Sequence, residues 1–148
     1  MMKIISLCPE HTGEWIIRDV FNCINNVTNI LVNCPDPAVR RNMGELISHL
    51  IIVHCNFFEV ELDTDFEPNF EKLESPDCDP LFFKNSGKVI MYILVKLYSI
   101  IGSNKATNYK RMEGYFRMWC ALAKNNVQIT EWLLRRGNCI RKFIGRSD

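Results

Sequence analysis

Two runs of apolar residues at helical spacing occupy the first part of the chain. Between residues 12 and 32 they recur every three or four positions, which indicates one face of a helix: Ile16, Val20, Ile24, Val27 and Leu31. Thr12 stands at the expected N-cap. A second helix is predicted to start near Pro37, with these side chains buried: Val39, Met43, Leu46, Ile47, Leu50, Val53 and Phe57. Residues 1–58 therefore predict a helical hairpin.

The corner of this hairpin is NCPDPAVRR, residues 33–41. Pro35 and Pro37 each restrict φ and remove a backbone donor, so a regular helix should end before them. Asp36 followed by proline in the first turn is a typical helix start. Gly44, inside the second helix, costs about 1 kcal/mol relative to alanine. It indicates either a close neighbouring backbone or simple tolerance.

The helical pattern stops between residues 59 and 86. Residues 59–79 contain nine acidic side chains against one lysine, and prolines follow one another at Pro68, Pro76 and Pro80. We expect an exposed acidic loop or linker in this segment. The alternative is that four aromatic side chains attach it to the helical body: Phe66, Phe70, Phe82 and Phe83.

Residues 87–148 predict a C-terminal helical segment. Residues 88–101 are apolar almost all round, which is typical of a buried helix; a strand is the alternative, but the length favours a helix. Asn108 is the expected cap of a helix with one apolar face: Met112, Phe116, Trp119 and Ala123. Asn126 is the expected cap of a short helix that ends at Gly137 and buries Ile129, Trp132 and Leu133. A final turn carries Ile140, Phe143 and Ile144.

These elements predict an all-α fold of five to six helices with an acidic loop insertion. Paired antiparallel helices fit an armadillo-like or HEAT-like segment of a larger solenoid, because such repeats diverge readily in sequence. No strict internal repeat is visible, so a free-standing helical bundle is the alternative architecture. At 148 residues and 47% hydrophobic content, the chain has enough apolar material for one packed domain.

Charge is distributed unevenly although the net charge is only +1. Residues 105–148 contain ten basic side chains against three acidic ones, opposite in sign to residues 59–79. The two regions could attract each other, or each could face a different partner. The seven cysteines are scattered with no CxxC spacing, and we expect reduced, buried thiols. Neither the N-terminus nor residues 89–101, which Lys96 interrupts, predicts a signal peptide or a membrane span. A cytoplasmic location follows, with a nuclear one left open.

Residue types that carry catalysis or bind metals are present, but their spacing does not support a site. His54 and Cys55 are neighbours on a predicted helix, so their side chains should point in different directions. Cys34, His49, His54 and Cys55 lack the spacing of zinc ligands. The glycines are isolated and form no phosphate-binding loop. We predict no catalytic residues, no metal and no cofactor in this chain.

A polar contact surface is the remaining candidate site. Its basic side chains come from two parts of the chain: Arg40, Arg41, Arg135, Arg136, Arg141 and Lys142. Basic residues also alternate with aromatic ones after residue 110, and this interleaving can bind nucleic acid through phosphate contacts and stacking. The aromatic residues follow helical spacing, however, which favours a buried core over an RNA-binding face. We therefore expect protein partners and no membrane.

Two segments resemble a known family. The sequence NCPDPAVRRNMGELISHLI, residues 33–51, is similar to a segment of the very large ubiquitin-specific proteases of the fat facets type. The sequence YFRMWCALAKNNVQITEWLLRRGNCIRKFIGRSD, residues 115–148, resembles the same region, with a Tyr-Phe start and a leucine-rich helix that ends in Arg-Gly. Met43 and Gly44 depart from the family, where a bulkier or alanine-rich position is usual.

The resemblance implies an armadillo-like helical region C-terminal to a peptidase domain. The whole parent protein would remove ubiquitin from substrates by a cysteine-type mechanism, and no position of this chain matches its catalytic cysteine and histidine boxes. This chain would then be a fragment, or a short divergent relative, that holds the peptidase domain, ubiquitinated substrates or adaptors. A standalone helical adaptor is the alternative function, followed by an RNA-binding helical module.

Overall fold

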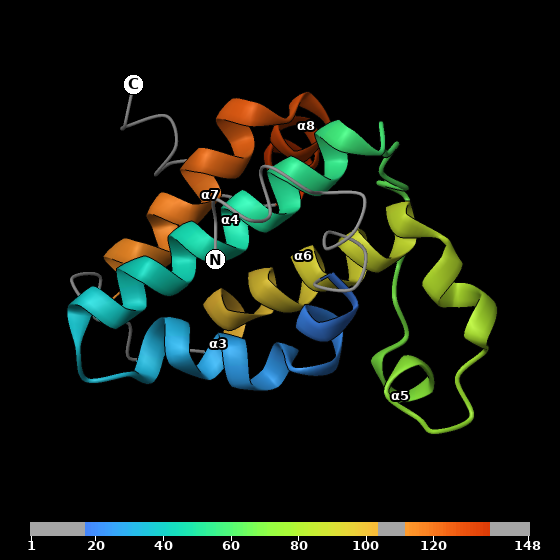
Figure 1. Cartoon of the computed structure of the whole chain (residues 1–148), viewed down its shortest axis with the longest axis horizontal. Coiled ribbons are helices and arrows are strands. Elements are labelled where there is room, and N and C mark those ends of the chain that lie inside the picture. Colours follow the sequence, from blue (N-terminus) through green and yellow to red (C-terminus); the bar gives the residue numbers. More distant parts are fainter. Residues whose placement is uncertain (1–16, 104–111, 137–148) are drawn as a thin grey trace.

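The computed structural model describes residues 17–103 and 112–136 of the chain. No strand occurs in these two ranges, so the predicted all-α class is confirmed for them. The main helices are α3 (Ile24–Asn33), α4 (Pro37–Phe57), α6 (Ser86–Ser103), α7 (Glu113–Asn125) and α8 (Val127–Arg136), as Figure 1 shows. Two short elements lie between α4 and α6: α5 (Phe70–Leu73) and the 3-10 helix η1 (Pro80–Lys84).

The first predicted helix is helical from residue 17 but is interrupted once. Residues 17–22 are helical, a turn follows at Cys23, and α3 begins at Ile24. The Cys23 N–H still donates to the Asp19 oxygen at 3.0 Å, and the Val27 N–H donates to the Cys23 oxygen at 3.0 Å. The predicted apolar stripe is buried at Val20, Ile24, Val27 and Leu31. The predicted cap Thr12 and the stripe residue Ile16 lie outside the described residues.

The predicted corner between α3 and α4 is confirmed. The Asp36 carboxylate accepts a hydrogen bond from the Ala38 N–H at 2.9 Å, and Pro37 occupies the first turn of α4. This bond satisfies one of the N–H groups that a helix start leaves without an intrahelical partner. The corner folds α4 back against α3, which forms the expected hairpin.

Helix α4 packs closely against α7 at a pair of glycines. A Cβ atom on Gly44 would lie 2.7 Å from the Gly114 oxygen, and one on Gly114 would lie 3.0 Å from the Arg40 oxygen. Gly44 therefore marks a close backbone approach, the first of the two interpretations that the sequence left open. Helices that cross this closely need small residues at the contact, because any side chain would separate the backbones.

The buried face of α4 differs from the predicted one at its ends. Ile47 and Leu50 are buried as expected, but Val39 and Phe57 are 41% and 47% exposed. Besides the apolar Ile51, the buried face includes polar and small residues: Arg40, Gly44, Ser48, His54 and Cys55. The reason is that α4 is packed between α3 and α7, so its contact with α7 selects small residues that an apolar stripe does not reveal.

Helix α6 lies at the centre of the fold (Figure 1). Six consecutive residues are at most 3% exposed: Val89, Ile90, Met91, Tyr92, Ile93 and Leu94. Burial of every position over more than one turn requires neighbours on all sides, as the apolar sequence predicted. The alternative of a strand at this position is wrong.

The acidic segment is packed against the helical body rather than free of it. The Phe21 ring contacts Phe82 and Phe83, with centroid distances of 5.7 and 4.9 Å. The Phe70 ring lies 5.4 Å from Tyr92 of α6. These contacts support the alternative in which phenylalanines attach the segment, and its acidic side chains face outward between them.

Helices α7 and α8 complete the core through aromatic side chains. Tyr98, Trp119 and Trp132 contact one another with centroid distances of 5.6 to 6.1 Å. The Asn126 carboxamide accepts from the Ile129 N–H at 3.1 Å, which confirms this predicted cap. Helix α7 begins at Glu113 with Met112 at the N-cap position. The predicted cap Asn108 and the final turn at residues 140–144 lie outside the described residues.

Candidate functional site

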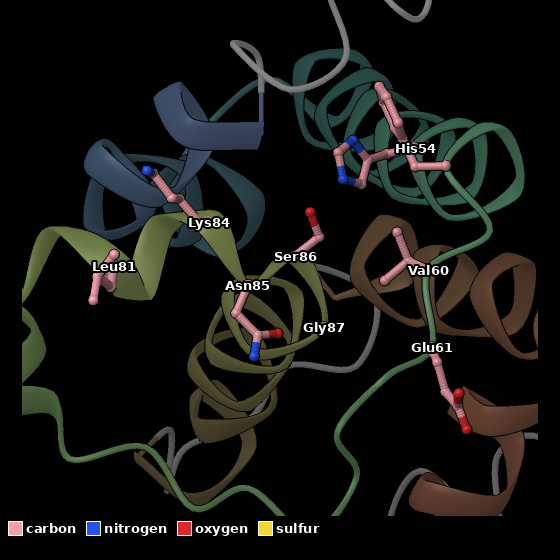
Figure 2. A pocket seen from close by; sticks show the side chains of 9 residues that line it. His54, Val60, Glu61, Leu81, Lys84, Asn85, Ser86 and Gly87 are labelled. Carbon is pink, nitrogen blue, oxygen red and sulfur yellow. The ribbon is translucent and has the colours of Figure 1, made fainter.

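An open hollow of about 450 Å³ lies where α4 ends and α6 begins (Figure 2). One wall comes from the end of α4 and the turn after it: His54, Phe58, Val60 and Glu61. The other wall comes from η1 and the first turn of α6: Leu81, Lys84, Asn85, Ser86 and Gly87. The hollow is therefore formed by two segments that are twenty positions apart in the sequence at their nearest residues, Glu61 and Leu81.

The first wall is shaped by how α4 ends. The Val60 N–H donates to the Cys55 oxygen at 3.0 Å, and Glu59 between them has φ of 49°. This is the Schellman arrangement, in which the chain leaves a helix through one left-handed residue. Glycine is usual at that position because a Cβ atom is disfavoured there. The turn directs Val60 into the wall of the hollow and leaves Glu61 at its edge.

The second wall is joined to the first by a close backbone approach. A side chain on Gly87 would collide with the carbonyl oxygen of Glu61. Asn85 starts α6, since its carboxamide oxygen accepts from the Lys88 N–H at 3.2 Å. Gly87 therefore lets the turn after α4 contact the first turn of α6, and the two walls are fixed relative to each other.

The floor of the hollow carries an imidazole and a hydroxyl group. Figure 2 shows the Ser86 hydroxyl pointing into the hollow on the side of the His54 ring. His54 is only 2% exposed, and its ring lies 4.8 Å from the Phe58 ring between centroids. A nucleophilic serine also needs an acid that orients the base. The Glu61 carboxylate points away from the imidazole in Figure 2, so Glu61 is not placed to orient His54 as a base.

The lining of the hollow is largely polar, but two large apolar side chains at its rim, Phe58 and Leu81, are exposed. Leu81 is 63% exposed, Phe58 is 38% exposed, and the neighbouring Phe57 is 47% exposed. The Phe57 and Phe58 rings contact each other with centroids 4.9 Å apart. Single exposed apolar side chains are ordinary, but several around one hollow are typical of an interaction site.

The arginines that the sequence singled out are not assembled into one surface. Arg40 is 9% exposed, and its guanidinium donates to the Cys34 oxygen at 2.5 Å and to the Pro35 oxygen at 3.3 Å. Arg40 is therefore a part of the helical corner, and its expected place on a contact surface has to be corrected. Arg41 is exposed on the first turn of α4.

The second arginine pair lies in the last turn of α8, far from the start of α4 in Figure 1. Arg135 pairs with Asp65 at 3.7 Å, and Arg136 pairs with Glu67 at 3.5 Å. Arg141 and Lys142 lie outside the described residues. None of the described arginines lines the hollow.

The acidic segment is thus attracted to the basic C-terminal region, one of the two alternatives that the charge pattern left open. A further ion pair fixes the segment to α6, where the Lys96 ammonium lies 2.6 Å from the Glu74 carboxylate. The Tyr92 hydroxyl donates to the same carboxylate at 2.8 Å. The hydrogen bonds from Lys96 and Tyr92 lower the pKa of Glu74 below its usual range.

The cysteines in the described ranges are not all buried, although the sequence predicted buried thiols. Among the five cysteines in the described ranges, Cys55 alone is buried and Cys23 is exposed. Burial raises the pKa of Cys55 to about 12, so its reactive thiolate is scarce at neutral pH. No group of three His, Cys, Asp or Glu side chains in the described part of the chain is arranged to hold a metal ion.

The aromatic residues of the basic region that lie in the described ranges are in the core, whereas Phe143 lies outside those ranges. Tyr115 and Trp119 are fully buried, and Phe116 and Trp132 are 4% and 3% exposed. The Tyr115 hydroxyl donates to the Leu97 oxygen of α6 at 2.7 Å. Bases stack only on exposed ring faces, so these four rings are not available to a nucleic acid.

Comparison of the chain with known protein families, curated proteins and solved structures gives no match. Within residues 17–103 and 112–136, no helix has the length and apolar character needed to cross a bilayer. Function therefore has to be argued from the hollow and from the two segments described above. Of the residues that line the hollow, sequence reasoning singled out His54 alone, as a base or a metal ligand. For the first wall, the sequence signal was FFEVE, residues 57–61, where the predicted helical pattern stops without a glycine.

Proposed function

We propose that this chain is a non-catalytic interaction region of a ubiquitin-specific protease of the fat facets type. In this proposal it is part of an armadillo-like helical array, C-terminal to the peptidase domain and located in the cytoplasm. It holds protein partners there: the peptidase domain itself, ubiquitinated substrates or adaptors. Removal of ubiquitin belongs to the peptidase domain of the parent.

The observation that carries the proposal is the packing of the two segments that resemble the family. Residues 33–51 form the corner and most of α4, and residues 115–136 form most of α7 and all of α8. The two segments meet at Gly44 and Gly114, where the helices approach most closely. The two segments that resemble the family therefore belong to one packed unit, as expected if they derive from one helical region of the parent.

The apolar rim of the hollow supports the role in holding partners. Phe58 and Leu81 expose large apolar side chains at a concave site, and Phe57, next to Phe58 in the chain, is exposed as well. In protein interfaces a few side chains that become fully buried in pockets supply most of the binding energy. A standalone adaptor would use the same surface, and it remains the second candidate for that reason.

The decisive experiment is to read the coding sequence around this chain. We expect an upstream, in-frame peptidase domain with its cysteine and histidine boxes. A complete transcript without that domain would overturn the proposal that the chain belongs to a ubiquitin-specific protease, and it would favour the standalone adaptor.

A second test uses the isolated chain and a ubiquitin-based thiol probe. We expect no covalent adduct, because Cys55 is buried as a thiol and the exposed Cys23 has no base assigned to it. An adduct that forms at one cysteine and is lost on its replacement by serine would contradict a non-catalytic role.

A further inference from the structure

We propose that the hollow between α4 and α6 binds a partner segment with one apolar anchor and basic flanking residues. The anchor enters the hollow, and the basic side chains pass Glu59 and Glu61. This inference deepens the proposed function, on which it rests, by naming the chemistry of a partner.

The apolar part of the argument comes from the two walls. Phe58 and Leu81 face the hollow from opposite segments, and both are exposed. Val60 contributes a third apolar side chain to the wall. A large apolar side chain placed between them would remove exposed apolar surface from water on both walls, which is the main source of binding free energy.

The charge of the partner follows from the carboxylates beside this hollow. Asp65, Glu67 and Glu74 of the acidic segment are paired with Arg135, Arg136 and Lys96. Glu59 and Glu61 are exposed, and no cation of the described residues lies within salt-bridge distance of either. A partner with lysine or arginine on this side would therefore meet complementary charge.

The orientation of the partner follows from the opposite wall. Figure 2 shows Lys84 and Glu61 on opposite sides of the hollow, with Ser86 between them. Basic residues of the partner should therefore lie over the Glu59–Glu61 turn and away from Lys84. Lys84 would repel a partner bound in the reverse direction, which favours a single register.

Glu59 also occupies a position at the helix end where glycine is usual. Its φ of 49° is in the left-handed region that favours glycine. The Schellman turn requires this conformation of whichever residue stands there. A glutamate here adds a carboxylate beside the hollow that glycine would not provide.

The experiment measures fluorescence anisotropy of three short peptides with the full chain. The first has a central phenylalanine flanked by lysines and arginines, the second has serine in place of the phenylalanine, and the third has acidic flanks. We expect the basic phenylalanine peptide to bind most tightly. Its affinity should fall about tenfold in Leu81→Ser and in Glu61→Lys, and rise in Lys84→Glu.

Glu71→Lys is the matched control, because Glu71 is an exposed acid on α5 outside the hollow. It should change the affinity little. Equal weakening by Glu71→Lys and Glu61→Lys would overturn the proposal and indicate unspecific attraction to the acidic segment. Equal binding of the serine peptide, tighter binding of the acidic peptide, or no binding of any peptide would overturn it too.

Two controls separate a loss of binding from a loss of folding and from a failure of the proposed parent protease. Leu81, Glu61 and Lys84 are exposed, so these variants should keep the helical circular dichroism of the parent chain. The outcome is also independent of the coding-sequence test. A failed peptide experiment removes the hollow as a docking site, whereas a missing peptidase domain removes the parent protease.

Discussion

At the scale of single residues, the adjacent arginines Arg40 and Arg41 differ in role because one side chain points inward and the other points into solvent. Arg40 points inward and donates to two carbonyl groups of the corner, whereas Arg41 is exposed on the same helical turn. The corner carbonyls lie after the end of α3 and have no helical partner there. The Arg40 side chain therefore caps the carbonyl groups that follow the end of α3. The sequence Arg40-Arg41 by itself does not show which of the two arginines does this.

Replacement of the two arginines tests this difference. Arg40→Ala should lower the free energy of unfolding by about 2 kcal/mol, because it removes charged hydrogen bonds and leaves partly buried carbonyls without a donor. Arg41→Ala is the matched control and should change it by less than about 0.5 kcal/mol. Urea unfolding followed by far-ultraviolet circular dichroism measures both values, and equal losses would contradict the capping role.

Glu59 gives a second prediction at this scale. Glu59→Gly should raise the free energy of unfolding by about 1 kcal/mol, because glycine adopts a positive φ without the steric cost of a Cβ atom. Glu61→Gly, two positions further along, should be neutral or destabilising, since Glu61 has a negative φ. Thermal unfolding of both variants measures the difference. A Glu59→Gly protein that is less stable than the parent chain would contradict the claim that Glu59 is strained.

At the scale of elements, the type of each long helix follows from its sequence, but the face that it buries does not. Helix α6 is apolar all round and is buried all round, so the prediction needed no knowledge of neighbours. Helix α4 packs against both α3 and α7, and its closest approach to α7 is at Gly44, which has no side chain. Periodicity identifies apolar faces, so it missed this second contact.

A single added methyl group tests the close approach of α4 and α7. Gly44→Ala should destabilise the protein by about 1 to 2 kcal/mol, although alanine is the better helix former. The new Cβ atom would lie 2.7 Å from the backbone oxygen of Gly114. Because this oxygen is a backbone atom, the clash can be relieved only if α4 and α7 move apart. Asn42→Ala, at an exposed position of α4, is the control and should be neutral or stabilising in denaturant unfolding.

At the scale of the whole molecule, residues far apart in the chain share one core. The N-terminal hairpin, the acidic segment and the C-terminal helices contribute side chains to the same buried cluster. Ion pairs between Asp65 and Arg135 and between Glu67 and Arg136 add contacts across nearly 70 positions. Each exposed pair is worth at most about 1 kcal/mol, so the aromatic and aliphatic core supplies most of the stability.

Cys55 can report on this shared core. With its pKa raised to about 12 by burial, Cys55 should stay unmodified by iodoacetamide at pH 8 while the exposed Cys23 reacts. Modification of Cys55 should begin only at urea concentrations that unfold the whole protein. Peptide mass spectrometry after labelling distinguishes the two sites. Early labelling of Cys55 would show that the end of α4 opens independently of the core.

The sequence by itself determined the helical class, the Pro-bounded corner with its Asp36 cap, the cap at Asn126 and the burial of α6. These features depend on local backbone chemistry or on uninterrupted apolar character, and both are properties of neighbouring residues. Only the tertiary structure decided the direction of Arg40, the glycine crossing and the hollow with its apolar rim. Each of these depends on atoms from segments far apart in the chain, and local patterns contain no information about such distances.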